Sequence, residues 1–210
     1  MAWTRLFGNR PAKTPLAEIA RHFNAAAGDE EHFPSTIDPR IYHVQLILDY
    51  FGSINGQRVL DVGCGKGRFA RVLQERNPGA KLVAFDLAEA MLRHVPAGIA
   101  TCAGSMTALP FSTGSFQCAY ATESLEHAVD IEAAVAEMCR IVKPGGRIVI
   151  IDKNREQWGR LKTPEWEKWF GRKELERLLG KRCRKVESRE ISYWEDVAPD
   201  GLFLAWLAEK

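Results

Sequence analysis

Residues 59–67 run Val59-Leu60-Asp61-Val62-Gly63-Cys64-Gly65-Lys66-Gly67 and carry the strongest fold signal in this 210-residue chain. They begin in an apolar run, Arg58 to Val62, and end in a glycine-rich turn that leads into a helical pattern from Arg68 to Arg76. Glycine has no Cβ and tolerates positive φ, so such a turn lets a ligand approach the main chain closely. The stretch predicts a strand, a ligand-binding turn and a helix, in that order.

Strand-like and helical patterns alternate on both sides of this stretch. Upstream, two helical patterns flank a loop over 28–39. The predicted segments are helices Leu16–Ala27, Ile41–Phe51, Ala88–His94 and Ile131–Val142, and strands Lys81–Phe85, Ile99–Cys102, Gln117–Ala121 and Arg147–Ile151. Such alternation predicts an α/β fold whose parallel sheet carries helices on both faces.

The C-terminal part has a different pattern. Two strand-like runs, Arg184–Tyr193 and Leu202–Leu207, are joined by the turn signal Ala198-Pro199-Asp200-Gly201 with no helix between them. Such a connection requires antiparallel pairing. We therefore expect a mostly parallel seven-stranded sheet with a C-terminal antiparallel hairpin at one edge.

Composition narrows the class of protein. Hydrophobic residues make up 46% and charged residues 27% of the chain, as in one compact domain. There is no apolar run of membrane-spanning length, and the first residues carry Arg5, Arg10 and Lys13 without a secretory apolar region. These features predict a cytoplasmic protein that neither crosses a membrane nor enters the secretory route. The five cysteines form no Cys-x-x-Cys pair, which disfavours a zinc cluster or a disulfide framework.

The charge balance does not favour nucleic acid as a partner. The formal net charge is only +2, although lysine and arginine are in excess from Lys153 to Arg189. We interpret this excess as a solvated helix face. Contacts to an anionic substrate or to phosphate are the alternative.

The spacing of the glycines indicates what kind of ligand the turn accepts. The pattern is Gly-x-Gly-x-Gly behind an acidic residue, whereas a dinucleotide site has Gly-x-Gly-x-x-Gly. This difference disfavours a nicotinamide or flavin dehydrogenase. Asp86 ends the next predicted strand, 21 residues after Gly65, where its carboxylate can accept hydrogen bonds from the ribose hydroxyls of an adenosine. The alternative role for Asp86 is to cap the helix that follows.

Five segments in order then resemble the class I S-adenosylmethionine-dependent methyltransferases, among them the type 11 group, over about Arg40 to Gly146. The matching segments are Val59–Gly67, Phe85–Leu87, Leu109–Phe111 with Ser115–Phe116, Leu125–His127 and Val142–Gly146. The resemblance implies a Rossmann-like three-layer sandwich, S-adenosyl-L-methionine as cofactor and methyl transfer to an acceptor. It also implies one domain with a helical cap over 1–55, a cofactor-binding core over 56–152 and an acceptor-side segment over 153–210.

The same resemblance assigns cofactor contacts residue by residue. The backbone at Gly63 and Gly65 would meet the methionine part, Asp86 the ribose, Leu87 one face of the adenine, and Ser105 with Met106 its edge. Arg40 matches a region in which quinone-pathway O-methyltransferases have an arginine that meets the cofactor carboxylate, and a role as a surface arginine is the alternative. The predicted set of cofactor-binding residues also includes Asp61, Cys64 and Thr122. The family often has aspartate where Ser105 stands, so the adenine amino contact passes to main chain or water here. Gln117 also replaces a common aspartate, which affects only the folding of that turn.

Catalysis by such an enzyme needs few residues, because the sulfonium is already an activated leaving group. If the acceptor is a hydroxyl, His127 or Glu123 would serve as general base. Orienting the local loop is the alternative role for His127. Glu123-x-x-Glu126-His127 also resembles the magnesium cluster of small-RNA 2′-O-methyltransferases, but no histidine follows His127, so we predict no metal.

Trp158, Trp166, Trp169 and Phe170 follow the last predicted parallel strand, where this fold commonly covers the acceptor. The helical spacing of Trp166, Trp169 and Phe170 favours core packing over an aromatic acceptor pocket. We predict O-methylation of a small molecule, anionic or aromatic, and the sequence does not indicate an oligomeric state. The alternatives are a methyltransferase acting on RNA, lipid or protein, and a non-catalytic S-adenosylmethionine-binding regulatory module. No Asn/Asp-Pro-Pro-Tyr motif follows Gln117–Ala121, which excludes the usual amino-group methylation of adenine or glutamine.

Overall fold

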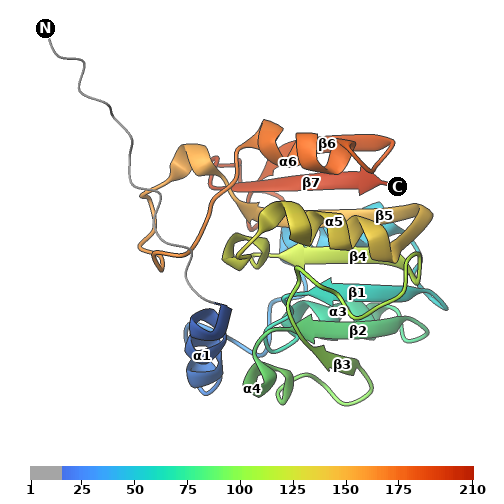
Figure 1. Cartoon of the computed structure of the whole chain (residues 1–210), viewed down its shortest axis with the longest axis horizontal. Coiled ribbons are helices and arrows are strands. Elements are labelled where there is room, and N and C mark those ends of the chain that lie inside the picture. The colour runs from blue at the N-terminus through green and yellow to red at the C-terminus, as the bar shows by residue number, and fades with distance from the viewer. Residues whose placement is uncertain (1–15) are drawn as a thin grey trace, which may run out of the picture.

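The computed structural model describes residues 16–210, in which one sheet has the strand order β3-β2-β1-β4-β5-β7-β6 (Figure 1). Strands β1 to β5 pair in parallel, and β7 is antiparallel to both β5 and β6. The strands are β1 (Arg58–Val62), β2 (Lys81–Asp86), β3 (Ala100–Ala103), β4 (Phe116–Thr122), β5 (Val142–Lys153), β6 (Lys185–Ile191) and β7 (Phe203–Glu209). The predicted mixed sheet with its C-terminal antiparallel hairpin is confirmed.

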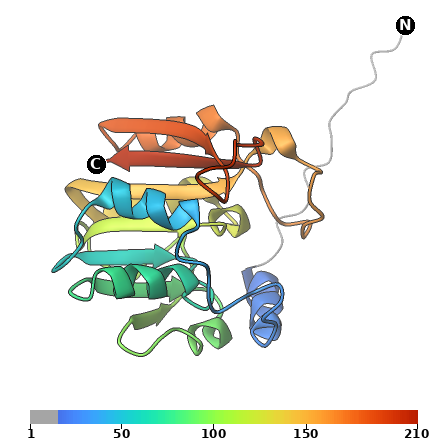
Figure 2. The ribbon, with the colours of Figure 1, turned by 180° about the vertical axis from the view of Figure 1, so that it is seen from behind.

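Helices cover both faces of this sheet. On one face lie α2 (Tyr42–Phe51) and α3 (Arg68–Arg76), and on the other lie α5 (Ile131–Ile141) and α6 (Arg172–Gly180) (Figures 1 and 2). The apolar run of β5 serves both layers, because Ile148 and Ile150 pack with α5 and α6 while the alternate residues pack with α2 and α3. A strand that is buried on both faces has such a continuous apolar sequence.

Four segments differ from what the sequence patterns suggest. Helix α4 spans only Glu89–Leu92, and β5 begins already at Val142, where a register shift in the β4–β5 pairing accommodates the Pro-Gly turn. Helix α6 was not predicted, although its leucines have helical spacing. Residues 158–170 are irregular, although Trp166, Trp169 and Phe170 have helical spacing in the sequence.

The N-terminal helix α1 (Leu16–Ala26) covers neither face of the sheet. It lies beyond the carboxyl ends of the parallel strands, beside α4 (Figures 1 and 2). The Asn24 side chain accepts a hydrogen bond of 2.8 Å from the Ala90 amide, and Phe23 packs against a small core with Ala88 and Met91. Helix α1 therefore closes one side of the sheet edge at which the predicted ligand-binding residues lie.

The predictions about membrane crossing and about the cysteines can be compared with the residues that the structure describes. From residue 16 onward, the chain has no helix with the length and apolarity that a membrane crossing requires. All five cysteines are free thiols, and all but Cys102 are buried, which agrees with packed cysteines rather than a disulfide framework. Arg5, Arg10 and Lys13 lie outside the described residues.

Candidate active site

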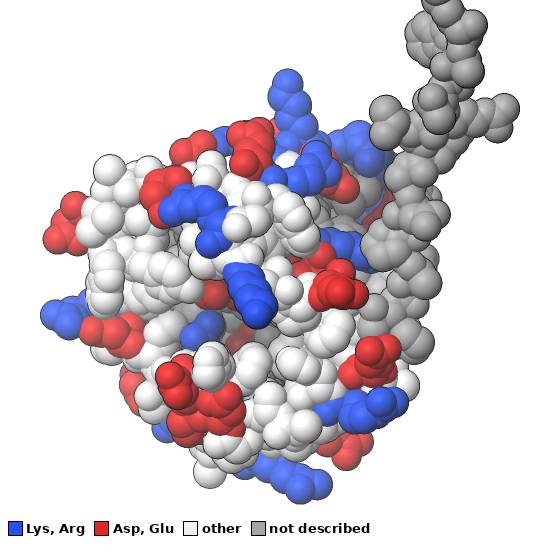
Figure 3. Space-filling view, turned by 90° about the vertical axis from the view of Figure 1, so that its left-hand side faces the viewer, with Lys and Arg blue, Asp and Glu red and all other residues white. Residues whose placement is uncertain are grey.

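A cavity of about 320 Å³ lies at the carboxyl ends of β1, β2 and β4. Strand β1 is flanked by β2 on one side and by β4 on the other, so the chain reverses its direction of travel across the sheet at this point. In open parallel sheets, ligands bind in the crevice at such a reversal. Figure 3 looks onto this edge of the molecule and shows a hollowed face with acidic and basic side chains mixed around it.

Two of the three glycines in the turn after β1 have different roles. Gly63 has a φ of +72°, and a Cβ there would lie 2.4 Å from the Cβ of Ser124. Gly65 has a φ of +54°, and its Cβ would meet nothing within 4 Å. Gly63 is therefore required by the packing of β1 against the loop after β4, whereas Gly65 leaves open space beside the main chain.

Asp86 connects the end of β2 to this turn. One carboxylate oxygen accepts a hydrogen bond of 2.8 Å from the Gly65 amide, and the other accepts one of 2.8 Å from the Ala88 amide. The N-cap of α4 is Ala88, so Asp86 is not the helix cap of the alternative interpretation. Burial raises the pKa of Asp86. Each carboxylate oxygen has two lone pairs, so Asp86 retains acceptor capacity for a ligand.

The structure brings most of the predicted site residues together around one cavity. The lining residues from that prediction are Asp61, Gly63, Cys64, Gly65, Asp86, Leu87, Ser105, Met106, Thr122, Glu123 and His127. They come from the ends of β1, β2 and β4 and from the loops that follow these strands and β3.

Arg40 is the exception and requires a correction. Its side chain is 79% exposed and donates to Asp38 at 2.7 and 3.0 Å, away from the residues that line the cavity. The short Asp38-Pro39-Arg40 turn lets the guanidinium fold back onto its own neighbour, a pairing that lowers the pKa of Asp38 to about 2. The arginine that lines the cavity is Arg68, at the start of α3.

Comparison with known proteins places this geometry in a family. A family model described as a methyltransferase domain matches residues 60–150. A demethylmenaquinone methyltransferase of Renibacterium salmoninarum is 35% identical over 123 residues, covering 57% of this chain and 51% of the relative. A malonyl-[acyl-carrier protein] O-methyltransferase of Methylococcus capsulatus is 34% identical over 97 residues, covering 43% and 35%. The family-model match assigns residues 60–150 to the class I S-adenosylmethionine-dependent methyltransferases.

Solved structures agree on the fold of this methyltransferase. The crystal structure of geranyl diphosphate C-methyltransferase from Streptomyces coelicolor A3(2), in complex with Mg²⁺, geranyl diphosphate and S-adenosyl-L-homocysteine, superimposes with a TM-score of 0.68. It is 18% identical, and the match covers 95% of this chain and 99% of that one. The chain spans about half the length, or less, of the curated relatives that it matches first.

The cavity fits S-adenosylmethionine, the cofactor of this family. Asp86 offers a carboxylate, and Gly65 offers main chain with open space beside it. The Thr122 hydroxyl is buried and has no hydrogen-bond partner within residues 16–210, so it is available to a polar ligand. Tyr120, which sequence reasoning did not identify, donates from β4 to Asp61 at 2.8 Å. Burial raises the pKa of Asp61 to about 7, which the Tyr120 hydrogen bond partly opposes.

Glu123 and His127, the two predicted bases, lie in different surroundings. Glu123 has a φ of +50°, and its carboxylate accepts from Arg68 at 3.4 Å and from the Tyr193 hydroxyl at 3.1 Å. His127 ends a short 3₁₀ helix, η1 (Leu125–His127), and its ring lies 4.9 Å from that of Phe23 on α1. Glu123 is thus held among polar partners, while His127 is packed under α1.

The His127 imidazole is neutral. Burial lowers the pKa of His127 to about 3, and the nearby Lys153 ammonium acts in the same direction. Its Nε2 lies 3.7 Å from Glu126 and 3.9 Å from Glu167, and its Nδ1 is buried without a hydrogen-bond partner in the described part of the chain.

A charged cluster that sequence reasoning missed surrounds this histidine. Lys153, at the end of β5, hydrogen-bonds Glu126 and lies 3.5 Å from Glu167. Ligand atoms of Glu126, His127 and Glu167 lie within 4.8 Å of one another, as in a metal site, but the Lys153 ammonium contacts both carboxylates. Glu123 stands apart from this group, so the Glu-x-x-Glu-His segment does not converge on one point. Glu167 could not be linked to Glu126 from the sequence, because 40 residues lie between them.

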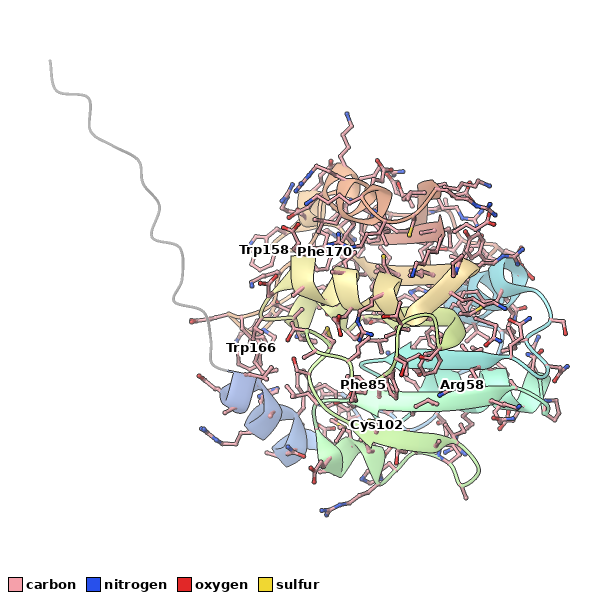
Figure 4. All side chains as sticks on the ribbon, turned by 45° about the vertical axis from the view of Figure 1, so that its right-hand side comes forward. Arg58, Phe85, Cys102, Trp158, Trp166 and Phe170 are labelled. Carbon is pink, nitrogen blue, oxygen red and sulfur yellow. The ribbon has the colours of Figure 1, made fainter. Side chains whose placement is uncertain are left out.

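The aromatic residues after β5 have separate roles. Trp169 and Phe170 are buried, as core packing predicts, whereas Trp158 is 57% exposed. Trp166 lies beside α1 with its ring 5.0 Å from that of His22 (Figure 4). Trp158, Trp169 and Phe170 line a second pocket, separate from the cavity at the strand ends. The phenylalanines that line that cavity are Phe23, Phe33, Phe69 and Phe85.

Proposed function

We propose that this methyltransferase transfers the methyl group of S-adenosylmethionine to a hydroxyl oxygen of a small molecule. The observation that carries the proposal is the position of the neutral His127, with its free Nδ1, in the same cavity as Asp86 and the glycine turn within the described residues 16–210. Helix α1 and the loop that follows it wall one side of this cavity, which favours a small acceptor over a polymer. The Methylococcus relative is named as an O-methyltransferase, which is consistent with an oxygen acceptor.

The cofactor end of the cavity has a distinct set of roles. Asp86 would accept from the ribose hydroxyls, Leu87 and Met106 would contact the adenine, and main chain at Gly65 would meet the methionine part. Arg68 replaces Arg40 as the partner of the methionine carboxylate, since a guanidinium fork suits a carboxylate. The cofactor supplies an electrophilic methyl group when bound.

His127 would act on the acceptor. A hydroxyl oxygen that gains a methyl group becomes strongly acidic, so even a weakly basic imidazole accepts its proton at Nδ1. The resulting imidazolium would be stabilised by Glu126 and Glu167, whose carboxylates lie beside Nε2. Exclusion of water by α1 would keep hydroxide from competing for the methyl group.

Binding and turnover test the proposal separately. We expect calorimetry to show binding of S-adenosylmethionine and of its demethylated product, and a panel of hydroxylated small molecules to yield methyl ethers. His127→Asn should lower kcat by about 100-fold or more, as loss of a general base does, with cofactor affinity unchanged. The matched control is His94→Asn, since His94 is exposed.

Two results would contradict the proposal. One is a product methylated on carbon, the chemistry for which the Streptomyces C-methyltransferase is named. The other is methyl-ether formation at the normal rate by the His127→Asn variant.

A further inference from the structure

We propose that Glu126, Glu167 and Lys153 form an acidic recognition site for the acceptor. This inference rests on the proposed function and names the class of its substrate. The site selects a small, largely apolar molecule whose polar end donates hydrogen bonds and carries no negative charge. We call these three residues the acidic floor of the cavity.

The acidic floor is a built part of the cavity. The Glu126, Glu167 and Lys153 side chains are only 1%, 5% and 10% exposed, and all three residues line the cavity. They come from η1, from the irregular segment before α6 and from the end of β5, so the fold gathers them from three elements. The Trp169 indole donates to Glu167 at 2.9 Å and fixes that carboxylate in place.

The charges of the floor do not balance. Asp152 lies directly behind it, accepting from the Glu126 amide at 3.1 Å and from the Lys153 amide at 2.8 Å. One ammonium therefore serves three buried carboxyl groups, and the neutral His127 adds no positive charge. Even with a proton on Glu126, two carboxylates outnumber Lys153. A buried excess of negative charge favours a ligand that brings positive charge or a donated hydrogen.

The buried atoms without a partner, one in the floor and one on the adjoining His127, can each accept a hydrogen bond. The second carboxyl oxygen of Glu126 is buried and has no partner in the structure from residue 16 to 210, and the same is true of His127 Nδ1. Burial and Asp152 raise the pKa of Glu126 well above its usual range, so charge on this carboxyl group is unfavourable even though Lys153 donates to its other oxygen, and a further donor would stabilise it. A hydroxyl or ammonium group would supply that donor, whereas a carboxylate would add a repelling charge.

Most of the rest of the acceptor end is apolar, although His22 of α1 also lines the cavity. Its walls are formed by α1 and by the loops after η1 and β5, through Leu16, Ile19, Phe23, Ala128, Val129 and Pro164. The lysines and arginines from 153 to 189 do not offset the floor, because among the residues that the structure places, only Lys153 of that set lines the cavity. The sequence-based alternative that these cations bind an anionic substrate therefore does not apply to this cavity.

Three probes of equal size test the proposal: benzylamine, benzyl alcohol and benzoate. Their binding is measured by ligand-observed NMR on the protein saturated with S-adenosylhomocysteine, so no turnover is needed. We expect benzylamine and benzyl alcohol to bind at least about tenfold more tightly than benzoate, the range of a charge-assisted hydrogen bond. Benzoate binding as tightly as benzylamine, or no binding by any of the three, would overturn the proposal.

Substitutions in the acidic floor test whether the probes bind there. Glu167→Gln should reduce the preference of benzylamine over benzoate about tenfold, and Glu126→Gln provides a second test if the first variant is unstable. The matched control is Glu165→Gln, which removes the same charge from an exposed position two residues away and should leave the preference unchanged. If the two floor variants and the control all show the same preference for benzylamine over benzoate, the acidic floor is not the recognition site. Methyl transfer to a hydroxyl could still hold in that case, so the two proposals fail separately.

Discussion

Two arginines, 28 residues apart, illustrate how a local neighbour decides the role of a residue. Arg40 has the sequence position expected of a carboxylate ligand, but Asp38 lies within reach and captures its guanidinium. Arg68 lies in the first turn of α3, where the glycine turn directs it to the cavity.

We predict that Arg68→Ala weakens the binding of S-adenosylhomocysteine about tenfold or more, because a charge-assisted contact to the carboxylate is lost. Arg40→Ala should leave the affinity unchanged. Isothermal calorimetry of both variants measures the difference. If Arg40→Ala weakens binding more than Arg68→Ala does, Arg40 is the partner of the cofactor carboxylate.

The two glycines of the turn allow a second residue-scale prediction. Gly63→Ala should lower the free energy of unfolding by about 2 kcal/mol or more, since strain at positive φ adds to a clash with Ser124. Gly65→Ala should cost about 1 kcal/mol, from the backbone strain alone. Urea unfolding of both variants measures the costs. The double variant Gly63→Ala/Ser124→Gly should recover part of the loss, and no recovery would mean that the clash is not the cause.

The sequence correctly predicted cavity-lining residues whose position is fixed by the backbone of a single element. Gly63, Gly65 and Asp86 follow directly from strand ends, and the sheet brings those ends together. It did not predict residues that meet across elements: nothing near Lys153 in the sequence indicates that it pairs with both Glu126 and Glu167.

At the scale of elements, the strands that are buried on both faces could be predicted closely, and the region after β5 could not. Helix α6 has Leu175, Leu178 and Leu179 at helical spacing, a signal that is present in Arg172–Gly180 but is diluted by the surrounding charges. The segment 158–170 has the same spacing without forming a helix. Its conformation is set by tertiary contacts, among them the bond from the Lys168 amide to the Glu126 carbonyl, which local sequence does not encode.

Helix α1 gives the element-scale prediction. Phe23 is the α1 side chain that contacts His127, so Phe23→Ala should raise the KM for the acceptor about tenfold by removing a wall of the cavity. Steady-state kinetics at saturating cofactor measure this change. Glu18→Ala, on the exposed side of the same helix, is the control. An unchanged KM in the Phe23 variant would mean that α1 does not bound the acceptor.

At the scale of the whole molecule, helix α2 meets the C-terminal hairpin at a buried histidine. His43 on α2 is fully buried, stacks on Tyr193 with ring centroids 4.7 Å apart and lies 5.3 Å from Phe203. Neither ring nitrogen has a hydrogen-bond partner among the residues from 16 to 210. Burial lowers the pKa of His43 to about 4, an effect that Arg68 supports and Glu123 opposes.

This histidine makes the stability of the fold depend on pH in a defined direction. In the unfolded chain its pKa is 6.5, so between about pH 6.5 and 4 the unfolded state binds a proton that the folded state does not. Its contribution to stability is therefore lost as the pH falls through that window. Asp61 and Asp152, with pKa values raised to about 7 and about 6, act in the opposite direction and mask the effect in the wild-type protein.

His43→Phe isolates the effect, because the variant keeps both aspartates. Phenylalanine preserves the aromatic contacts and removes two unpaired polar atoms, so the variant should be at least as stable as the wild type at pH 7. Its advantage should grow by about 3 kcal/mol between pH 7 and pH 4, the free-energy equivalent of a histidine pKa lowered from 6.5 to about 4. Urea unfolding at several pH values measures the difference between the two proteins, with His94→Gln as the exposed control. A difference that does not change with pH would show that the folded protein accommodates a charged His43, and the packing of α2 against Tyr193 would then have to be looser than the ring distances indicate.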